Sequence, residues 1–197
     1  MAISYNKKNR IFKLDTESTS YLIGISPEGY VGHVYYGERL KGDDAYYLLR
    51  TQESPYTPSK NEREKLSFLD YFPMEYSSGG IGDFRESCIN IRNSAGCMAS
   101  EFFYESYEIT KGKAKLEGLP ASFGEKDDVT TLTVKCVDPV LEIELALSYS
   151  VFERVDIITR SVKVINKGTE HVKLEKVYSA CVDMDNESFE LITLCGA

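Results

Sequence analysis

The sequence predicts an all-β protein, a large antiparallel sandwich of about ten or more strands with few or no helices. Three observations favour this class: long alternating apolar patterns, turn-forming residues between them, and no convincing amphipathic helix beyond a possible short one at residues 62–69. The clearest pattern spans residues 141–151, where apolar side chains occupy every second position and polar ones such as Glu142 and Ser148 stand between. Only an extended strand keeps such a stripe on one face.

The expected strands follow one another along the whole chain. In order they span residues 11–14, 20–25, 31–36, 87–92, 102–110, 131–137, 141–152, 155–166, 172–182 and 189–194. Between them stand residues that favour turns, including Pro27-Glu28-Gly29, Asp138-Pro139 and Lys167-Gly168. Many short strands with this punctuation are typical of a sandwich.

In the strand expected at residues 155–166, polar and apolar side chains share one set of alternate positions. The β-branched residues at these positions are Ile158, Val162 and Val164, and the polar ones are Asp156, Arg160 and Asn166. The strong β-propensity of the segment predicts an extended conformation.

Length, charge and cysteine content narrow the class further. With 197 residues, of which 42% are apolar, one domain with a substantial core is expected. A net charge of -8 argues against a nucleic-acid partner, because binding to phosphates requires a cationic surface. Neither an export leader nor a membrane-spanning stretch stands out. Five cysteines without C-x-x-C spacing indicate neither a disulfide framework nor a zinc site, so we expect a cytoplasmic protein.

A long connection at about residues 41–82 interrupts the regular spacing of strands. Its middle, residues 51–65, is polar and contains Pro55 and Pro58, so it should run over the surface. Such a loop is either functional or a disordered insert. It leads into Gly82-Asp83-Phe84-Arg85-Glu86, which has two interpretations. One is a bend in which Arg85 pairs with Asp83 or Glu86 and Phe84 anchors the core; the other is a surface that meets a sugar or a catalytic domain.

The remaining reactive side chains indicate structure rather than catalysis. Asp183, Asp185 and Glu187 have the spacing of a calcium loop, but Ser188 stands where that loop requires glycine. His33 and His171 lie in strand patterns and are expected to be structural. We therefore assign no metal, no cofactor and no catalytic residue.

Several strings recur in a fixed order from one end of the chain to the other. They are Thr19-Ser20-Tyr21, Gly32-His33-Val34-Tyr35-Tyr36-Gly37, Glu75-Tyr76, Gly82-Asp83-Phe84-Arg85, Gly112-Lys113, Leu116-Glu117-Gly118-Leu119-Pro120-Ala121, Tyr149-Ser150-Val151-Phe152-Glu153, Asp156-Ile157-Ile158-Thr159-Arg160-Ser161, Asn166-Lys167-Gly168 and a closing strand from Phe189 to Gly196. Together they resemble the N-terminal domain of the α-galactosidases of glycoside hydrolase family 36. The resemblance covers essentially the whole chain.

The resemblance implies that residues 1–197 form a large β-sandwich (a supersandwich) that precedes a (β/α)8 barrel. In this family two aspartates of the barrel cleave terminal α-galactosides, such as melibiose or raffinose, with retention of configuration. The catalytic barrel is absent from this chain, so the chain alone is expected to be inactive. The implied partners are this barrel, further copies in a homo-oligomer, and a galactoside substrate, but neither nucleic acid nor membrane.

The resemblance also implies candidate substrate-binding residues. In family tetramers the long loop of this domain reaches the active-site mouth of a neighbouring subunit and contributes one acidic and one basic side chain. The nearest matches by spacing are Glu53 and Lys65, although Arg50 could align instead. Asp83 and Arg85 complete the candidate set.

Two other functions fit the same residues. The first is a stand-alone carbohydrate-binding module that stacks sugars on exposed rings, although the absence of tryptophan weakens it. It is suggested by eight aromatic residues: Tyr35, Tyr36, Tyr46, Tyr47, Tyr56, Tyr71, Phe72 and Tyr76. The second is a purely architectural domain, which shapes an active site and an oligomer without binding a ligand itself.

Overall fold

A computed structural model describes residues 2–49, 68–124, 126–182, 190 and 192–193. These residues form ten strands: β1 (Ile3–Asn6), β2 (Ile11–Asp15), β3 (Thr19–Ile25), β4 (Val31–Glu38), β5 (Ile89–Arg92), β6 (Phe103–Lys111), β7 (Val129–Asp138), β8 (Ile143–Phe152), β9 (Ile157–Asn166) and β10 (Lys173–Val177). One short 3-10 helix, η1 (Tyr46–Leu48), accompanies them. Among the described residues, no helix has both the length and the apolar character needed to cross a bilayer. The prediction of an all-β fold is confirmed.

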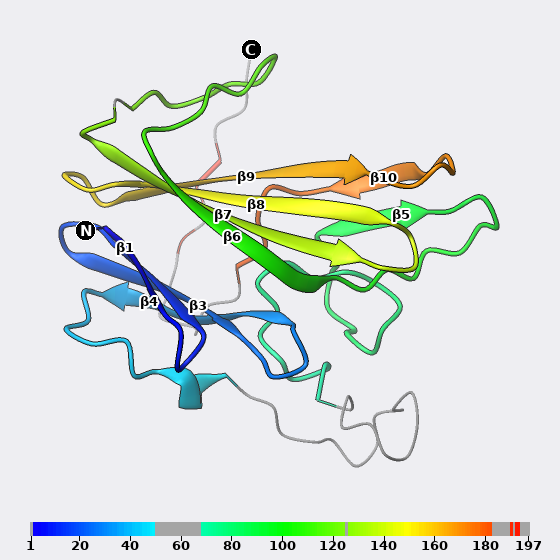
Figure 1. Ribbon diagram of the computed structural model, residues 1–197, viewed down its shortest axis with the longest axis horizontal. Helices are drawn as coiled ribbons and strands as arrows, with labels where there is room; N and C mark the ends of the chain where they lie inside the picture. Colours follow the sequence, from blue (N-terminus) through cyan, green and yellow to red (C-terminus); the bar gives the residue numbers. More distant parts are fainter. Residues whose placement is uncertain (1, 50–67, 125, 183–189, 191, 194–197) are drawn as a thin grey trace.

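The strands form three antiparallel sheets. The first sheet has the order β1-β2-β3-β4, the second has the order β6-β7-β8-β9, and the small sheet pairs β10 with β5. Figure 1 shows the first sheet, in blue, stacked against the second sheet, in green to orange, with the small sheet at one end. Sequential strands within each large sheet pair with each other, and the predicted turns at residues 27–29 and 138–139 connect β3 to β4 and β7 to β8.

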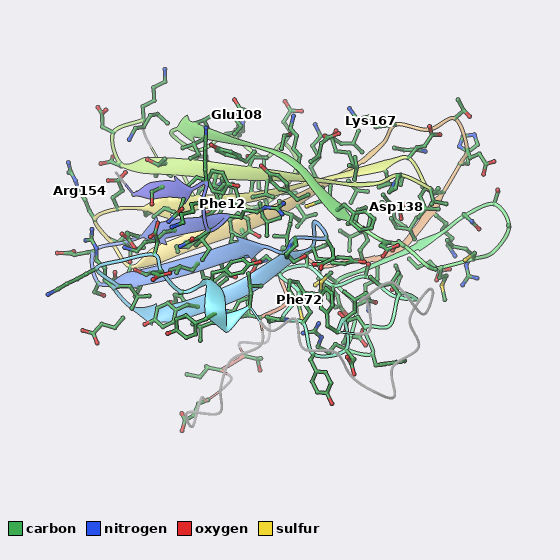
Figure 2. The ribbon with its side chains drawn as sticks, turned by 60° about the horizontal axis from the view of Figure 1, so that its bottom comes forward. Phe12, Phe72, Glu108, Asp138, Arg154 and Lys167 are labelled. Atoms are coloured by element: carbon green, nitrogen blue, oxygen red, sulfur yellow. The ribbon has the colours of Figure 1, made fainter. Side chains whose placement is uncertain are left out.

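The main core lies between the first and second sheets. It includes Phe12 and Ile23 from the first sheet and Leu132 and Leu145 from the second. The alternating stripe predicted for β8 is confirmed, since its inward side chains are all buried: Ile143, Leu145, Leu147, Tyr149 and Val151. Each such side chain contributes roughly 1.5–3 kcal/mol by leaving water. In Figure 2, Phe12 lies in the interior and Glu108 and Arg154 lie at the periphery.

A second core covers the other face of the first sheet. Phe68 and Phe72 stack there edge to face at 5.5 Å, and Tyr30 packs against both. Gly32 of β4 lies beneath them, and a Cβ at this position would come within 2.7 Å of Phe72 Cζ. The first sheet is therefore buried on both faces, and the segment at residues 68–75 is fixed against it.

The expected strands differ from the observed ones mainly at their ends. The sequence reasoning missed β1, a strand of four residues in which only Ile3 is buried. The strand expected at residues 172–182 is shorter, because β10 ends at Val177. Residues 62–67 of the possible helix, residues 189, 191 and 194 of the expected closing strand, and the polar middle of the long connection lie outside the described residues. The described residues 190, 192 and 193 belong to no strand.

Candidate functional site

The turn at residues 82–86 brings Asp83 and Arg85 together. Arg85 Nε donates to Asp83 Oδ1 at 2.9 Å, and a second guanidinium nitrogen donates to the carbonyl of Phe72. Asp83 is buried, and Gly82 permits the bend with a φ of 99°. The predicted pairing of Arg85 with Asp83 is confirmed, whereas Glu86 forms an ion pair with Lys176 instead.

Phe84 points away from this ion pair. The prediction that Phe84 anchors the core is wrong, because its side chain is 79% exposed. Asp83 and Arg85, on either side of it, are paired with each other, and their side chains are 1% and 29% exposed. The turn thus holds a phenyl ring in solvent on a rigid base. The other two candidate residues, Glu53 and Lys65, lie outside the described residues.

A buried carboxylate lies between the two large sheets. Glu75 is 1% exposed and accepts hydrogen bonds from Tyr21 Oη at 2.8 Å and Tyr149 Oη at 2.9 Å. Arg160 Nη2 lies 2.7 Å from Glu75 Oε1. His33 Nδ1 lies 3.4 Å from Glu75 Oε2, without the geometry of a hydrogen bond. We call these five residues the Glu75 cluster.

Four strands and one loop position the Glu75 cluster. The amide of Glu75 donates to the carbonyl of Val31 at 3.0 Å, which fixes the loop beside β4. Tyr149 of β8 and Arg160 of β9 are direct partners in the register of the second sheet. The guanidinium carbon of Arg160 lies 5.1 Å from the centroid of the Tyr149 ring, within the range of a cation–π contact.

The charges within the cluster compensate one another. Burial would raise the pKa of Glu75, but Arg160 and then His33 act against it, and the net pKa is lowered. Burial and the negative charge of Glu75 raise the pKa of both Tyr21 and Tyr149. Burial alone would lower the pKa of Arg160, but the negative charge of Glu75 acts in the opposite direction, and the net pKa of Arg160 is raised. The cluster is therefore an ionised pair to which two neutral phenols donate.

This arrangement favours structure over catalysis. A retaining glycosidase places two carboxyl groups about 5–5.5 Å apart at a site that the sugar can reach. Glu75 is instead enclosed, and its oxygens are saturated by donors from the same domain. Among the described residues, no group of three or more histidine, cysteine, aspartate or glutamate side chains could hold a metal ion.

The sequence reasoning did not find the Glu75 cluster, although it quoted all five residues in separate strings. His33 was expected to be structural, and its place beside Glu75 and the ring of Tyr21 agrees with this. The sequence does contain one indication of the cluster. Arg160 occupies the same alternate positions of its strand as Ile158, Val162 and Val164, which face inward. A cation on the core side of a strand requires a buried anion.

A groove of about 360 Å³ lies between β9 and the connection from β6 to β7. Its walls are formed by Lys113, Leu116, Pro120, Ala121 and Ser122 on one side and by Thr159, Arg160 and Ser161 on the other. The hydroxyl oxygen of Thr159 is buried and has no hydrogen-bond partner among the described residues.

The fold and the Glu75 cluster together define an all-β sandwich domain with a buried, paired carboxylate between its two large sheets. The chain belongs to the glycosyl hydrolase family 36 N-terminal domain family, whose model matches residues 29–197.

Relatives match the chain from end to end. It is 36% identical to the bifunctional α-galactosidase/sucrose kinase AgaSK of Mediterraneibacter gnavus, over 100% of this chain and 21% of that protein. It is also 36% identical to the α-galactosidase Mel36A of Lactobacillus acidophilus, over 99% of this chain and 27% of that protein. The chain thus spans about a quarter of the length of these relatives.

Solved structures agree with the sequence matches. The galactosidase domain of AgaSK superimposes with a TM-score of 0.86 at 37% identity, over 92% of this chain and 25% of that one. The α-galactosidase AgaB of Geobacillus stearothermophilus does so with a TM-score of 0.83 at 30% identity, over 91% of this chain and 24% of that one. The resemblance to this family that the sequence strings indicated is confirmed.

Proposed function

We propose that this chain is the non-catalytic N-terminal domain of an α-galactosidase that hydrolyses terminal α-galactosides, such as melibiose or raffinose, with retention of configuration. One observation carries the proposal: relatives that are α-galactosidases match this chain along its whole length but are about four times as long. The two catalytic carboxyl groups would then belong to a (β/α)8 barrel in the rest of the parent protein.

The domain's own task would be to shape the active site and the oligomer. The rigid turn that displays Phe84 supports this role, because a large ring held in solvent by a buried ion pair suits contact with another surface. Glu53 and Lys65 would reach the active-site mouth of a neighbouring subunit, with Asp83 and Arg85 nearby. A homo-oligomer and a galactoside substrate are parts of this proposal.

A cytoplasmic location is also part of the proposal. Cys88, Cys97 and Cys136 are free thiols, which fits a reducing compartment. The acidic balance of 31 carboxylates against 23 cationic side chains supports the absence of a nucleic-acid partner.

Hydrolysis of a chromogenic α-galactoside tests the proposal. The parent protein, expressed from a reading frame that extends past residue 197, should release the chromophore, whereas residues 1–197 alone should not exceed background. Turnover by residues 1–197 alone would show that the catalytic groups lie in this domain after all. A parent that is folded but cleaves only other glycosides would contradict the proposed substrate.

A stand-alone carbohydrate-binding module is the second candidate. The observation in its favour is the exposure of several aromatic rings, among them Tyr47 at 80%, Phe84 at 79% and Tyr71 at 59%. Rings in solvent can stack against the apolar face of a sugar. Titration of residues 1–197 with melibiose in a calorimeter separates the two functions, since saturable binding would favour the module and its absence the scaffold.

A further inference from the structure

The second core holds both flanks of the long connection. Residues 50–67 of this connection lie outside the described residues, but Leu49 before them and Phe68 after them are both buried, at 5% and 1% exposure. Both side chains belong to the same apolar cluster against the first sheet. The two flanks are therefore anchored in one place.

Two glycines of the first sheet form the floor of this place. Gly24 of β3 and Gly32 of β4 are direct partners in the register of the sheet. A Cβ at Gly24 would lie 2.2 Å from Leu49 Cδ1, and a Cβ at Gly32 would lie 2.5 Å from Leu49 Cδ2 and 2.7 Å from Phe72 Cζ. Glycine in a strand permits this close approach. Leu49 and Phe72, from opposite flanks of the connection, thus meet over one floor.

The ion pair of Asp83 with Arg85 is attached to the same place. Arg85 Nη2 donates to the carbonyl oxygen of Phe72 and also to Asp83 Oδ2 at 3.0 Å. Arg85 Nε donates to Asp83 Oδ1 at 2.9 Å, so two parallel bonds fix the direction of the guanidinium. The Asp83 side chain is 1% exposed, which keeps its carboxylate out of the reach of a sugar. The pair therefore acts on the backbone of Phe72.

The backbone that follows Phe72 is tied to the first sheet. The amide of His33 donates to the carbonyl of Pro73 at 2.6 Å, and the amide of Glu75 donates to the carbonyl of Val31 at 3.0 Å. These two bonds hold the segment along β4. We call the two glycines, the two apolar side chains over them and the ion pair the loop anchor: Gly24, Gly32, Leu49, Phe72, Asp83 and Arg85.

We propose that the ion pair of Asp83 with Arg85 is a positioning element of the parent α-galactosidase, which fixes the flanks of the long connection through Phe72 and contacts no sugar itself. The proposal rests on the proposed function, in which Glu53 and Lys65 of this connection reach the active-site mouth of a neighbouring subunit.

The loop anchor acts on substrate binding rather than on bond cleavage. Flanks that are already fixed reduce the ordering that must accompany binding, and loose flanks weaken binding because this ordering then costs free energy. The two catalytic carboxyl groups belong to the barrel and keep their geometry. Damage to the loop anchor should therefore raise KM and leave kcat unchanged, as expected when binding is lost equally from the ground state and the transition state.

A matched pair of leucine variants in the parent protein tests the proposal with raffinose as substrate. Leu49→Ala opens a cavity in the loop anchor, whereas Leu145→Ala opens one in the main core, where Leu145 is 1% exposed. We expect Leu49→Ala to raise KM about fivefold or more and Leu145→Ala to change it less than about twofold, with kcat nearly constant in both. Equal rises in KM would assign the effect to a general loss of packing and would overturn the proposal. Leu49→Val and Leu145→Val give the same comparison if an alanine variant does not fold.

Variants of Asp83 separate positioning from direct contact. Asp83→Ala should raise KM as Leu49→Ala does, and Asp83→Asn should raise it less, because the amide keeps one oxygen acceptor for Arg85. A rise in KM from Asp83→Ala without one from Leu49→Ala would mean that the ion pair touches the sugar, and the positioning role would be wrong. An active parent in which none of these variants changes KM would contradict the positioning role alone. A wild-type parent that cleaves no α-galactoside would contradict the proposed function, and the positioning role with it.

Discussion

Arg160 and Glu75 join the two large sheets of the sandwich through one ion pair, with Arg160 Nη2 2.7 Å from Glu75 Oε1. Arg160 belongs to β9 of the second sheet, and Glu75 is tied to β4 of the first sheet through Val31. Tyr21 and Tyr149 approach the same carboxylate from both sheets. The polar contact across the apolar core therefore fixes how one sheet lies over the other, since its donors must all converge on one carboxylate.

Replacing Glu75 with glutamine should destabilise the domain strongly. The substitution keeps the size of the side chain but leaves the buried guanidinium of Arg160 without its counter-charge, which costs about 3 kcal/mol or more. Denaturant unfolding measures the loss. Glu86→Gln is the matched control, because Glu86 pairs with Lys176 at the surface and should change stability by less than about 1 kcal/mol. Equal losses in the two variants would contradict the role assigned to Glu75.

A double-mutant cycle should show that Glu75 and Arg160 act as a unit. Arg160→Met alone leaves a buried carboxylate unpaired and should cost about 3–5 kcal/mol. The combination of Glu75→Gln with Arg160→Met removes both charges, so its cost should be smaller than the sum of the single costs by at least about 1 kcal/mol. Chemical denaturation of the four proteins gives the coupling energy. Additive losses would show that the two side chains are independent.

The Glu75 cluster should also make the domain sensitive to acid. The pKa of Glu75 is lowered in the folded state from its ordinary value of 4.5. Its contribution to stability is therefore complete above that value and is lost as the pH falls through the lower folded pKa. Stability measured between pH 7 and pH 3 should fall more steeply in the native protein than in Glu75→Gln. Parallel curves below pH 4.5 would show that other carboxylates cause the acid sensitivity.

The sequence allowed the strands to be predicted better than the contacts between them. β8 and β9 were predicted nearly to the residue, because alternation along a strand is a local property that survives in any sandwich. The pairing of Arg85 with Asp83 was also local. Glu75 offered no such pattern, since its partners come from four strands distant in sequence. Phe84 was assigned to the core because of its residue type, whereas its direction depends on the ion pair around it.

Asp83 and Phe84 should differ sharply in their effect on stability. Asp83→Ala leaves a partly buried guanidinium without its main acceptor and should cost about 1–3 kcal/mol. Phe84→Ser removes a ring that is already 79% exposed and should change stability by less than about 0.5 kcal/mol. In a chain of this size the first change lowers the melting temperature by several degrees, roughly 2–4 °C per kcal/mol. A large loss from Phe84→Ser would place this ring in a packed interior.

Cys97 and Cys136 should react at very different rates with a thiol-alkylating reagent. The thiolate is the reactive form, and burial raises the pKa of Cys136 to about 12, with a smaller contribution from Glu105. Cys97 is exposed in the turn after β5. Treatment of the native protein with iodoacetamide at pH 8, followed by peptide mapping, should label Cys97 within minutes and leave Cys136 unlabelled. Unfolding in guanidinium should make both cysteines reactive, and Cys97→Ser removes the fast signal as a control. Rapid labelling of Cys136 in the native protein would mean that the sandwich opens between β7 and its neighbours far more often than a packed core allows.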